Sequence, residues 1–175
     1  MKMLKKLLAV VLTGAMALTL FTACGSNAVR DKDIADALNN IVKLNDSEVT
    51  FTPRAKEREM AQKVAALLES HSEDDSNSAE LSAKIQGILG IDQGGVNENN
   101  FVWVQNALTD KLGAEGQAFQ VMESLTDKGG AYNFSSLGSK EPADTRYMGT
   151  ALCKIPDQKD NLVTVRVIVV TAEAK

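Results

Sequence analysis

The sequence has 175 residues, with 19 lysines and arginines against 23 aspartates and glutamates, and its formal net charge is −4 at pH 7. An acidic chain does not attract nucleic acid or an anionic lipid surface through its overall charge, so we expect no nucleic-acid partner. The length suits one folded domain, and because only 5% of the residues are aromatic, its core must be mainly aliphatic.

The first residues have the three parts of a bacterial export signal. Lysines at positions 2, 5 and 6 form a basic start, an apolar run covers 7–23, and small residues surround Cys24. This order is typical of a secretory signal peptide. The run is shorter than the roughly 20 apolar residues that a membrane-spanning helix needs. We therefore expect residues 1–23 to be a signal peptide that is removed.

The signal ends in the sequence LFTAC at positions 20–24. This segment resembles the lipobox of bacterial lipoproteins, with Phe21 where that motif usually has leucine. The resemblance implies that Cys24 is diacylated, becomes the first mature residue and anchors the protein to the extracytoplasmic face of the cell membrane. Two acyl chains give stable attachment where one is marginal. Residues 24–30 would then be a short lipidated tether. The alternative is an ordinary signal peptide with an incidental cysteine.

Apolar residues recur at helical spacing in four segments after the tether. They are Ile34, Leu38, Ile41 and Val42; Met60, Val64, Leu67 and Leu68; Leu81, Ile85, Ile88 and Leu89; and Ala118, Val121, Met122 and Leu125. We expect a helix in each segment. Asp31 lies near the start of the first helix, Thr52 caps the second with Pro53 in its first turn, Gly90 stops the third, and glycines 129 and 130 end the fourth.

The strand signals come later in the chain. The apolar run 101–104 is compatible with either a strand or a helix. Segments 147–155 and 162–171, joined by a polar turn, predict an antiparallel hairpin. The second segment is apolar on both faces near its end, although Arg166 interrupts one of them, so we expect helices on both sides. The predicted fold class is α+β, an α–β–α sandwich with helices packed on an antiparallel sheet that includes the C-terminal hairpin.

Once Cys24 carries lipid, Cys153 has no cysteine with which to form a disulfide. It lies in an apolar strand pattern, where a cysteine is usually buried and inert. A reactive thiol would need a basic neighbour that lowers its pKa, but Lys154 is adjacent in the strand and therefore points to the other face.

An ordered series of short motifs runs through the domain. Its members are Met60–Ala65, Ser70–Ser76, Gln105–Leu108, Val121–Lys128 and Tyr147–Ala151. The series resembles the CAP superfamily, the SCP-like extracellular domains of bacteria. Those domains carry an alanine-rich helix ending near Ser-His, a Gly-Glu-Asn-Ile-Ala segment, a helix ending in Trp-x-x-Ser-Pro-Gly-His-Arg, and a Tyr-x-Gly-hydrophobic strand. The resemblance implies a single CAP-like domain over 31–175.

The resemblance also implies a ligand-binding cleft formed by His71, Gln105, Asn106 and Asp127. His71 matches the family's first histidine, whereas Gln105 replaces the glutamate and Asp127 replaces the second histidine. Glutamine is not ionisable and is a poor metal ligand, so we expect neither a metal nor another cofactor in this cleft. Taken without the resemblance, His71 is a surface histidine at a helix end, and Gln105 and Asn106 are ordinary polar residues of a turn.

Three functions are compatible with these residues. The first is a lipid-anchored binding domain without catalytic residues, whose ligand is a small apolar molecule, a peptide or an envelope component. The second is an extracytoplasmic hydrolase with His71 as general base, oriented by Asp127, and with Ser70, Ser72 or Ser124 as nucleophile. The third is a lipoprotein whose surface serves protein partners. The sequence contains no G-x-S-x-G, H-E-x-x-H, C-x-x-C or P-loop motif, and its single histidine excludes sites that need two.

Overall fold

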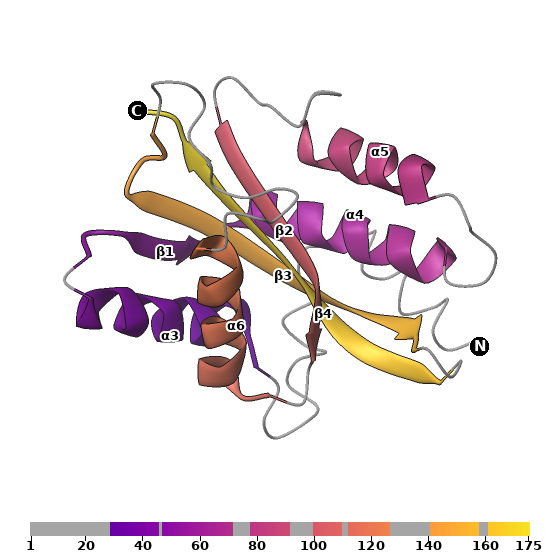
Figure 1. Ribbon diagram of the computed structural model, residues 1–175, viewed down its shortest axis with the longest axis horizontal. Helices are drawn as coiled ribbons and strands as arrows, with labels where there is room; N and C mark the ends of the chain where they lie inside the picture. The colour runs from indigo at the N-terminus through magenta and orange to yellow at the C-terminus, as the bar shows by residue number, and fades with distance from the viewer. Residues whose placement is uncertain are drawn as a thin grey trace.

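The computed structural model describes residues 29–45, 47–71, 78–91, 100–109, 112–126, 141–157 and 161–175, with the backbone alone at 71, 78, 100–109 and 126. In chain order, its elements are α3 (Asp31–Leu44), β1 (Thr50–Pro53), α4 (Ala55–His71), α5 (Ser78–Leu89), β2 (Asn100–Thr109), α6 (Ala114–Thr126), β3 (Thr145–Pro156) and β4 (Leu162–Glu173). Figure 1 shows these helices packed around the strands. The prediction of an α+β fold is confirmed.

The strands form one sheet in the order β1–β3–β4–β2. The predicted C-terminal hairpin is its centre, with β3 and β4 antiparallel from the pair Tyr147 and Thr171 to the pair Pro156 and Leu162. The ambiguous run after position 100 is the strand β2, which pairs antiparallel with β4. The short strand β1 pairs parallel with the start of β3 and was not anticipated. The sheet is therefore antiparallel except at one edge.

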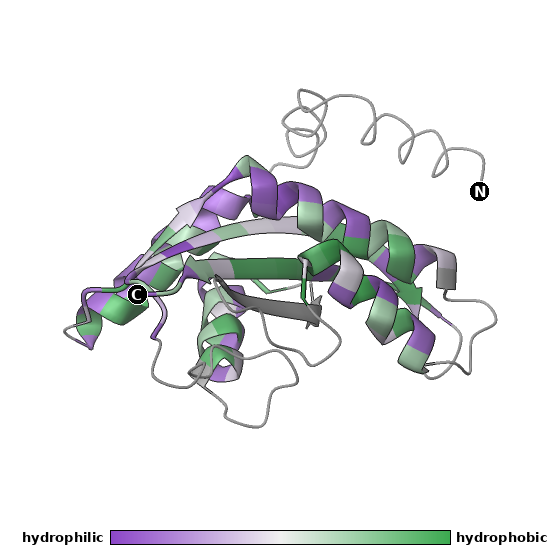
Figure 2. Ribbon diagram, turned by 90° about the horizontal axis from the view of Figure 1, so that it is seen from above, coloured by the Kyte–Doolittle hydropathy of each residue, from purple (hydrophilic) through white to green (hydrophobic). Residues whose placement is uncertain are grey.

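Helices cover both faces of this sheet and give the α–β–α arrangement. One core joins α3 and α6 to the sheet face that carries Met148, Ile168 and Val170. The other joins α4 and α5 to the face that carries Cys153 and Val167. Successive strand residues point to opposite faces, so the odd- and even-numbered residues of β4 enter different cores. Figure 2 shows hydrophobic strands in the interior, between helices that also carry hydrophilic residues.

The expected burial of β4 on both sides is confirmed. Val165, Val167 and Val169 are buried on the face toward α4 and α5. Ile168 and Val170 are fully buried on the opposite face. A strand with apolar neighbours on both faces reads as a nearly continuous hydrophobic run, which explains why the sequence signal was strongest here.

The four helices occupy the segments with helical periodicity. Gly90 follows α5 with a φ of +67°, the left-handed conformation that commonly ends a helix and that glycine adopts without strain. The described part of α6 ends at Thr126, and the glycines expected to terminate it lie outside the described residues.

The start of α4 differs from the prediction. Thr52 and Pro53 belong to β1, and the helix begins only at Ala55. The cause is tertiary, because Phe51 is buried and its backbone N–H and carbonyl both bond to the side-chain amide of Asn39, at 2.7 and 2.9 Å. These contacts hold the segment extended. A proline, which has no N–H, is tolerated at the end of such an edge strand.

Candidate functional site

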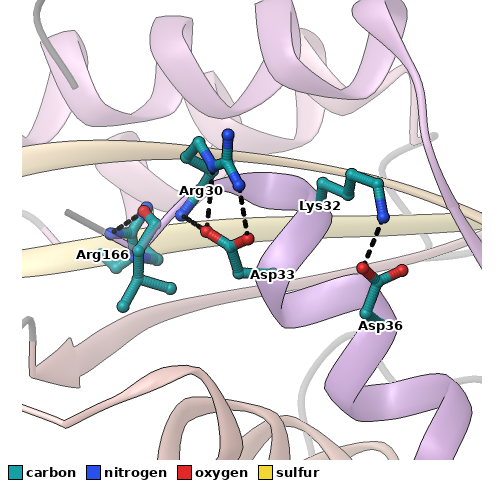
Figure 3. Close-up of polar contacts among 6 residues, drawn as sticks. Arg30, Lys32, Asp33, Asp36 and Arg166 are labelled. Atoms are coloured by element: carbon teal, nitrogen blue, oxygen red, sulfur yellow. Dashed lines mark hydrogen bonds and ion pairs between the residues drawn. The ribbon is translucent and has the colours of Figure 1, made fainter. Parts of the chain in front are cut away.

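A buried network of hydrogen bonds fixes the place where the chain enters the fold. The Arg166 guanidinium donates from Nη2 to the backbone carbonyl of Val29 (3.0 Å) and from Nη1 to Oγ1 of Thr150 (2.9 Å). The Thr150 hydroxyl donates in turn to Oδ1 of Asp31, the first residue of α3 (2.5 Å). Asp31, Thr150 and Arg166 are all buried. Figure 3 shows Arg166 beside the start of this helix.

Arg58 completes this network from the other side of the sheet. Its Nε donates to Oδ2 of Asp31 at 2.7 Å. Arg58 belongs to α4 and Asp31 to α3, and these helices cover opposite faces. The ion pair can pass the edge of the sheet because β1 ends at Pro53, opposite Met148, and pairs with no later residue of β3. Asp31 therefore ties both helical layers to one point of the sheet.

The two residues before α3 also belong to the fold. Val29 packs against the core that contains α3. The Arg30 N–H donates to Asp33 at 2.8 Å, and its guanidinium makes two more hydrogen bonds to the same carboxylate (Figure 3). Hydrogen bonds from Arg30 hold the pKa of Asp33 below its ordinary value. Residues 29 and 30 were expected in the tether, but these contacts place them in the folded domain.

A second buried carboxylate lies between α4 and the sheet. Glu57 is fully buried and accepts hydrogen bonds from the Arg54 guanidinium and from the Thr171 hydroxyl (2.7 Å each). Burial acts to raise the pKa of Glu57, but the hydrogen bonds from Arg54 and Thr171 outweigh it and hold the pKa below its ordinary value. The Arg54 guanidinium also lies over the Tyr147 ring, 3.6 Å from its centroid.

Between the two networks, α4 comes into direct backbone contact with β3 at Gly149. A Cβ added to Gly149 would lie 2.0 Å from the backbone nitrogen of Arg58. Only a residue without a side chain permits this approach. Tyr147 and Gly149, the two residues of the Tyr-x-Gly motif, thus both contact the start of α4. Their spacing of two places them on the same face of the strand.

These two networks have the form of structural ion pairs. Each carboxylate, Asp31 or Glu57, is held by one arginine and one threonine hydroxyl. Networks of this kind fix how elements pack against each other, since a buried charge without partners is costly. These residues were not predicted to be partners, and few local features could have shown it. The signals present in the sequence were Asp31 near a helix start and Arg166 within an apolar strand.

The structure describes none of the side chains of the predicted cleft residues. His71 is the last residue of α4 and is described by its backbone alone. Gln105 and Asn106 also have only described backbones, and both lie in β2, with Gln105 opposite Ile168 and an irregularity of register after it. They are thus in a strand and not in the turn of the alternative interpretation. Asp127 and Cys24 lie outside the described residues.

Cys153 behaves as predicted for an inert thiol. It is 2% exposed, and burial together with the nearby Glu69 carboxylate raises the pKa of the thiol to about 11. The thiolate is the reactive form of cysteine, so a thiol that stays protonated at neutral pH is a poor nucleophile. A catalytic role for Cys153 is therefore not supported.

Among the described residues, no cluster of three or more histidine, cysteine or acidic side chains is placed to hold a metal ion. None of the described helices has the length and apolar character needed to cross a bilayer. No protein-family model, curated protein or solved structure matches the chain. The CAP resemblance and the expected export signal are therefore predictions from sequence motifs.

Proposed function

We propose that this chain is an exported binding domain of the bacterial cell envelope, anchored by lipid on Cys24 to the extracytoplasmic face of the membrane. The observation that carries the proposal is the lipobox-like segment that ends in Cys24, a short distance before the fold. Val29, five positions after Cys24, already has its carbonyl bonded to Arg166. Five extended residues span at most about 17 Å, so the anchor would hold the domain directly at the membrane surface.

The network at the entry point supports this role. A tether attached before Val29 transmits any pull from the membrane to the start of α3. Asp31 at this point bonds to Thr150 of β3 and to Arg58 of α4, so the load is shared among three elements. A start held in this way resists local unfolding better than a free terminus, which is usually poorly ordered.

For the ligand, we propose a CAP-like cleft that includes His71, Gln105, Asn106 and Asp127. The α–β–α layering is the architecture expected for this resemblance. Because Gln105 and Asp127 replace the family's glutamate and histidine, binding in the cleft depends on shape and hydrogen bonding. The ligand class is a small apolar molecule, a peptide or an envelope component.

The anchor is tested by mass spectrometry of the mature N-terminus, with a matched pair of cysteine variants. Cys24→Ala should leave the protein unprocessed or release it from the membrane. Cys153→Ala should leave lipidation unchanged, because that thiol is buried in the core. An unmodified Cys24 in the wild-type protein, or cleavage at another residue, would contradict the proposal.

The cleft is tested by calorimetric titration of the purified protein with zinc. We expect no tight, stoichiometric uptake, because one imidazole beside a glutamine is a poor metal site. Tight binding that His71→Ala abolishes would show that the site retains the metal chemistry that the CAP resemblance associates with histidines and glutamates.

A further inference from the structure

Among the described residues, no helix packs on one face of the end of the β3–β4 hairpin. We call it the distal face and define it by Leu152, Lys154 and Pro156 of β3 and Leu162 and Thr164 of β4. Their cross-strand register places these residues on the same side of the sheet. The opposite side of the same segment packs against the core of α4 and α5. In Figure 1 this end of the hairpin extends beyond α3 and α6.

The distal face combines exposed leucines with an exposed lysine and with the half-buried Pro156 and Thr164. Leu152 is 47% exposed and Leu162 is 68% exposed, and Lys154 is exposed between them. A single exposed leucine is ordinary, but two leucines beside a proline on one strand face form a small apolar surface. Lysine suits the rim of such a surface, because its stem can lie on apolar groups while its ammonium reaches polar ones.

The distal face begins where the tether leaves the fold. Leu152 is the cross-strand partner of Arg166, and Arg166 binds the carbonyl of Val29. From Arg166 to Leu162 the strand extends about 13 Å, at about 3.3 Å per residue. The residues between Cys24 and Val29 reach at most about 17 Å. A membrane that holds Cys24 therefore lies within reach of the whole distal face.

We propose that the distal face rests on the lipid bilayer, with Leu162 and Leu152 directed at the boundary between headgroups and acyl chains and Lys154 at the level of the phosphates. This inference rests on the proposed lipid anchor. The α3–α6 layer packs on the same side of the sheet as the distal face, so the hairpin end meets the bilayer when the domain tilts toward it. The tilt lifts the C-terminal end of α3 and turns the α4–α5 layer away from the membrane.

The lipid chemistry follows from the charges. The chain as a whole is acidic, so a zwitterionic bilayer fits it better than an anionic one. The acyl chains hold the domain at the membrane, so the effective concentration of lipid near the distal face is high. A weak contact between the two leucines and the bilayer is then enough to orient the domain.

The test uses the full-length, lipidated protein in phosphatidylcholine vesicles that contain a doxyl-labelled phosphatidylcholine as quencher. An environment-sensitive fluorophore is attached to Lys154→Cys, on the distal face, or to Leu44→Cys as a control. Leu44 is 86% exposed and ends α3, about 20 Å from the entry point at 1.5 Å per residue. Cys24 is acylated and Cys153 is buried, so neither competes for the label.

We expect the doxyl lipid to quench the label at position 154 at least twofold more than the label at position 44. Adding Leu152→Gln and Leu162→Gln to the labelled Lys154→Cys protein should reduce its quenching to the control level. Equal quenching at both positions in a protein whose lipidation is verified by mass spectrometry would overturn the surface proposal and leave the anchor intact. If the fluorescence falls only with the number of protein molecules per vesicle and not with the doxyl lipid, the distal face contacts a second copy of the chain. This result would also overturn the surface proposal. If Cys24 carries no lipid in the wild-type protein, both the proposed anchor and the proposed membrane contact of the distal face are wrong.

Discussion

The two halves of the β3–β4 hairpin have the same backbone pairing but different surroundings. In the proximal half, where 147–151 faces 167–171, helices cover both sides of the sheet. In the distal half, where 152–156 faces 162–166, α4 and α5 cover one side and the other side carries the exposed Leu152 and Leu162. The alternation of residues along a strand therefore determines the face of the sheet on which each side chain lies. The packing of helices determines which of the two faces is buried.

The polar residues of the hairpin also differ in burial. Thr150 and Thr171 in the proximal half are buried, and each has an acidic partner on the start of α3 or α4. Lys154 in the distal half is exposed and can be solvated by water. A buried polar group needs a protein partner because removing it from water without one costs free energy. The two buried threonines, and Arg166 where the two halves meet, therefore depend on specific neighbours much more than Lys154 does.

The largest expected effect is at the helix–strand contact of the proximal half. Gly149→Ala places a Cβ 2.0 Å from the backbone nitrogen of Arg58, so α4 must move away from β3. We expect the free energy of unfolding, measured with denaturant, to fall by more than about 3 kcal/mol, above the usual range for overpacking because backbone must shift.

Gly87→Ala is the matched control. Gly87 lies within α5 with open space around its missing Cβ. We expect this variant to be more stable than wild type by roughly 0.5–1 kcal/mol, the difference in helix propensity. If both glycine variants change the free energy of unfolding by the same amount, the backbone contact between Gly149 and α4 does not make the proximal half more sensitive to substitution.

The second largest effect is expected when Arg54, the cation that pairs with Glu57, is removed. Arg54→Met leaves a fully buried carboxylate with only the Thr171 hydroxyl as a described side-chain donor. We expect a loss of about 3 kcal/mol at neutral pH, at the lower end for a broken buried pair because Arg54 is itself partly exposed. Denaturant unfolding measures it.

The pH dependence of this loss identifies its cause. In the wild type the pKa of Glu57 lies below its ordinary value of 4.5, so its stabilising contribution is present above about pH 4.5 and is lost as the pH falls through the lowered pKa. In Arg54→Met, burial should instead raise the pKa of Glu57, so the folded variant takes up a proton. The deficit relative to wild type should therefore shrink as the pH falls from 7 toward 4. A deficit that is constant over this range would mean that lost packing, and not charge, explains it.

A smaller effect is expected for an apolar deletion in the same half. Val167 is fully buried, and Val167→Ala should cost about 1–3 kcal/mol through lost burial and the cavity left behind. Val163, in the distal half, is only partly buried, so Val163→Ala should cost less. Thermal and denaturant unfolding of the pair measure the difference, and equal losses would mean that the α4–α5 core buries Val163 as completely as Val167.

The smallest effect is expected on the distal face. Leu152→Gln and Leu162→Gln should each change the free energy of unfolding by less than about 0.5 kcal/mol, as is usual for exposed positions. A loss of 2 kcal/mol or more from either variant would mean that its side chain has a buried partner within the protein. In that case the distal face would not be free to meet a membrane.

Local chemistry predicted much of this fold. Helical periodicity located the four helices, Gly90 marked the end of α5, and the alternation of valines located β4. These features depend on neighbours a few residues apart, so the sequence shows them directly. The burial of Val165 and Val167 and the inert state of Cys153 were also predictable, since each follows from an apolar strand pattern.

The candidate sites were less predictable. The entry network joins Asp31 to Thr150 and Arg166, residues more than a hundred positions apart, and no local pattern marks them as partners. The cleft of His71, Gln105, Asn106 and Asp127 came from a resemblance between motifs and stays a prediction, because its side chains lie outside the described residues.

The sequence by itself determined the helical segments, the hairpin and the side of the sheet that each strand residue takes, because these follow from periodicity along the chain. Only the tertiary structure decided that Thr52 and Pro53 are strand, that Gly149 lies beneath a helix, and that Leu152 is exposed while Thr150 is buried. The physical reason is that burial and pairing are set by which distant segments pack together, and that contact carries more free energy than local propensity.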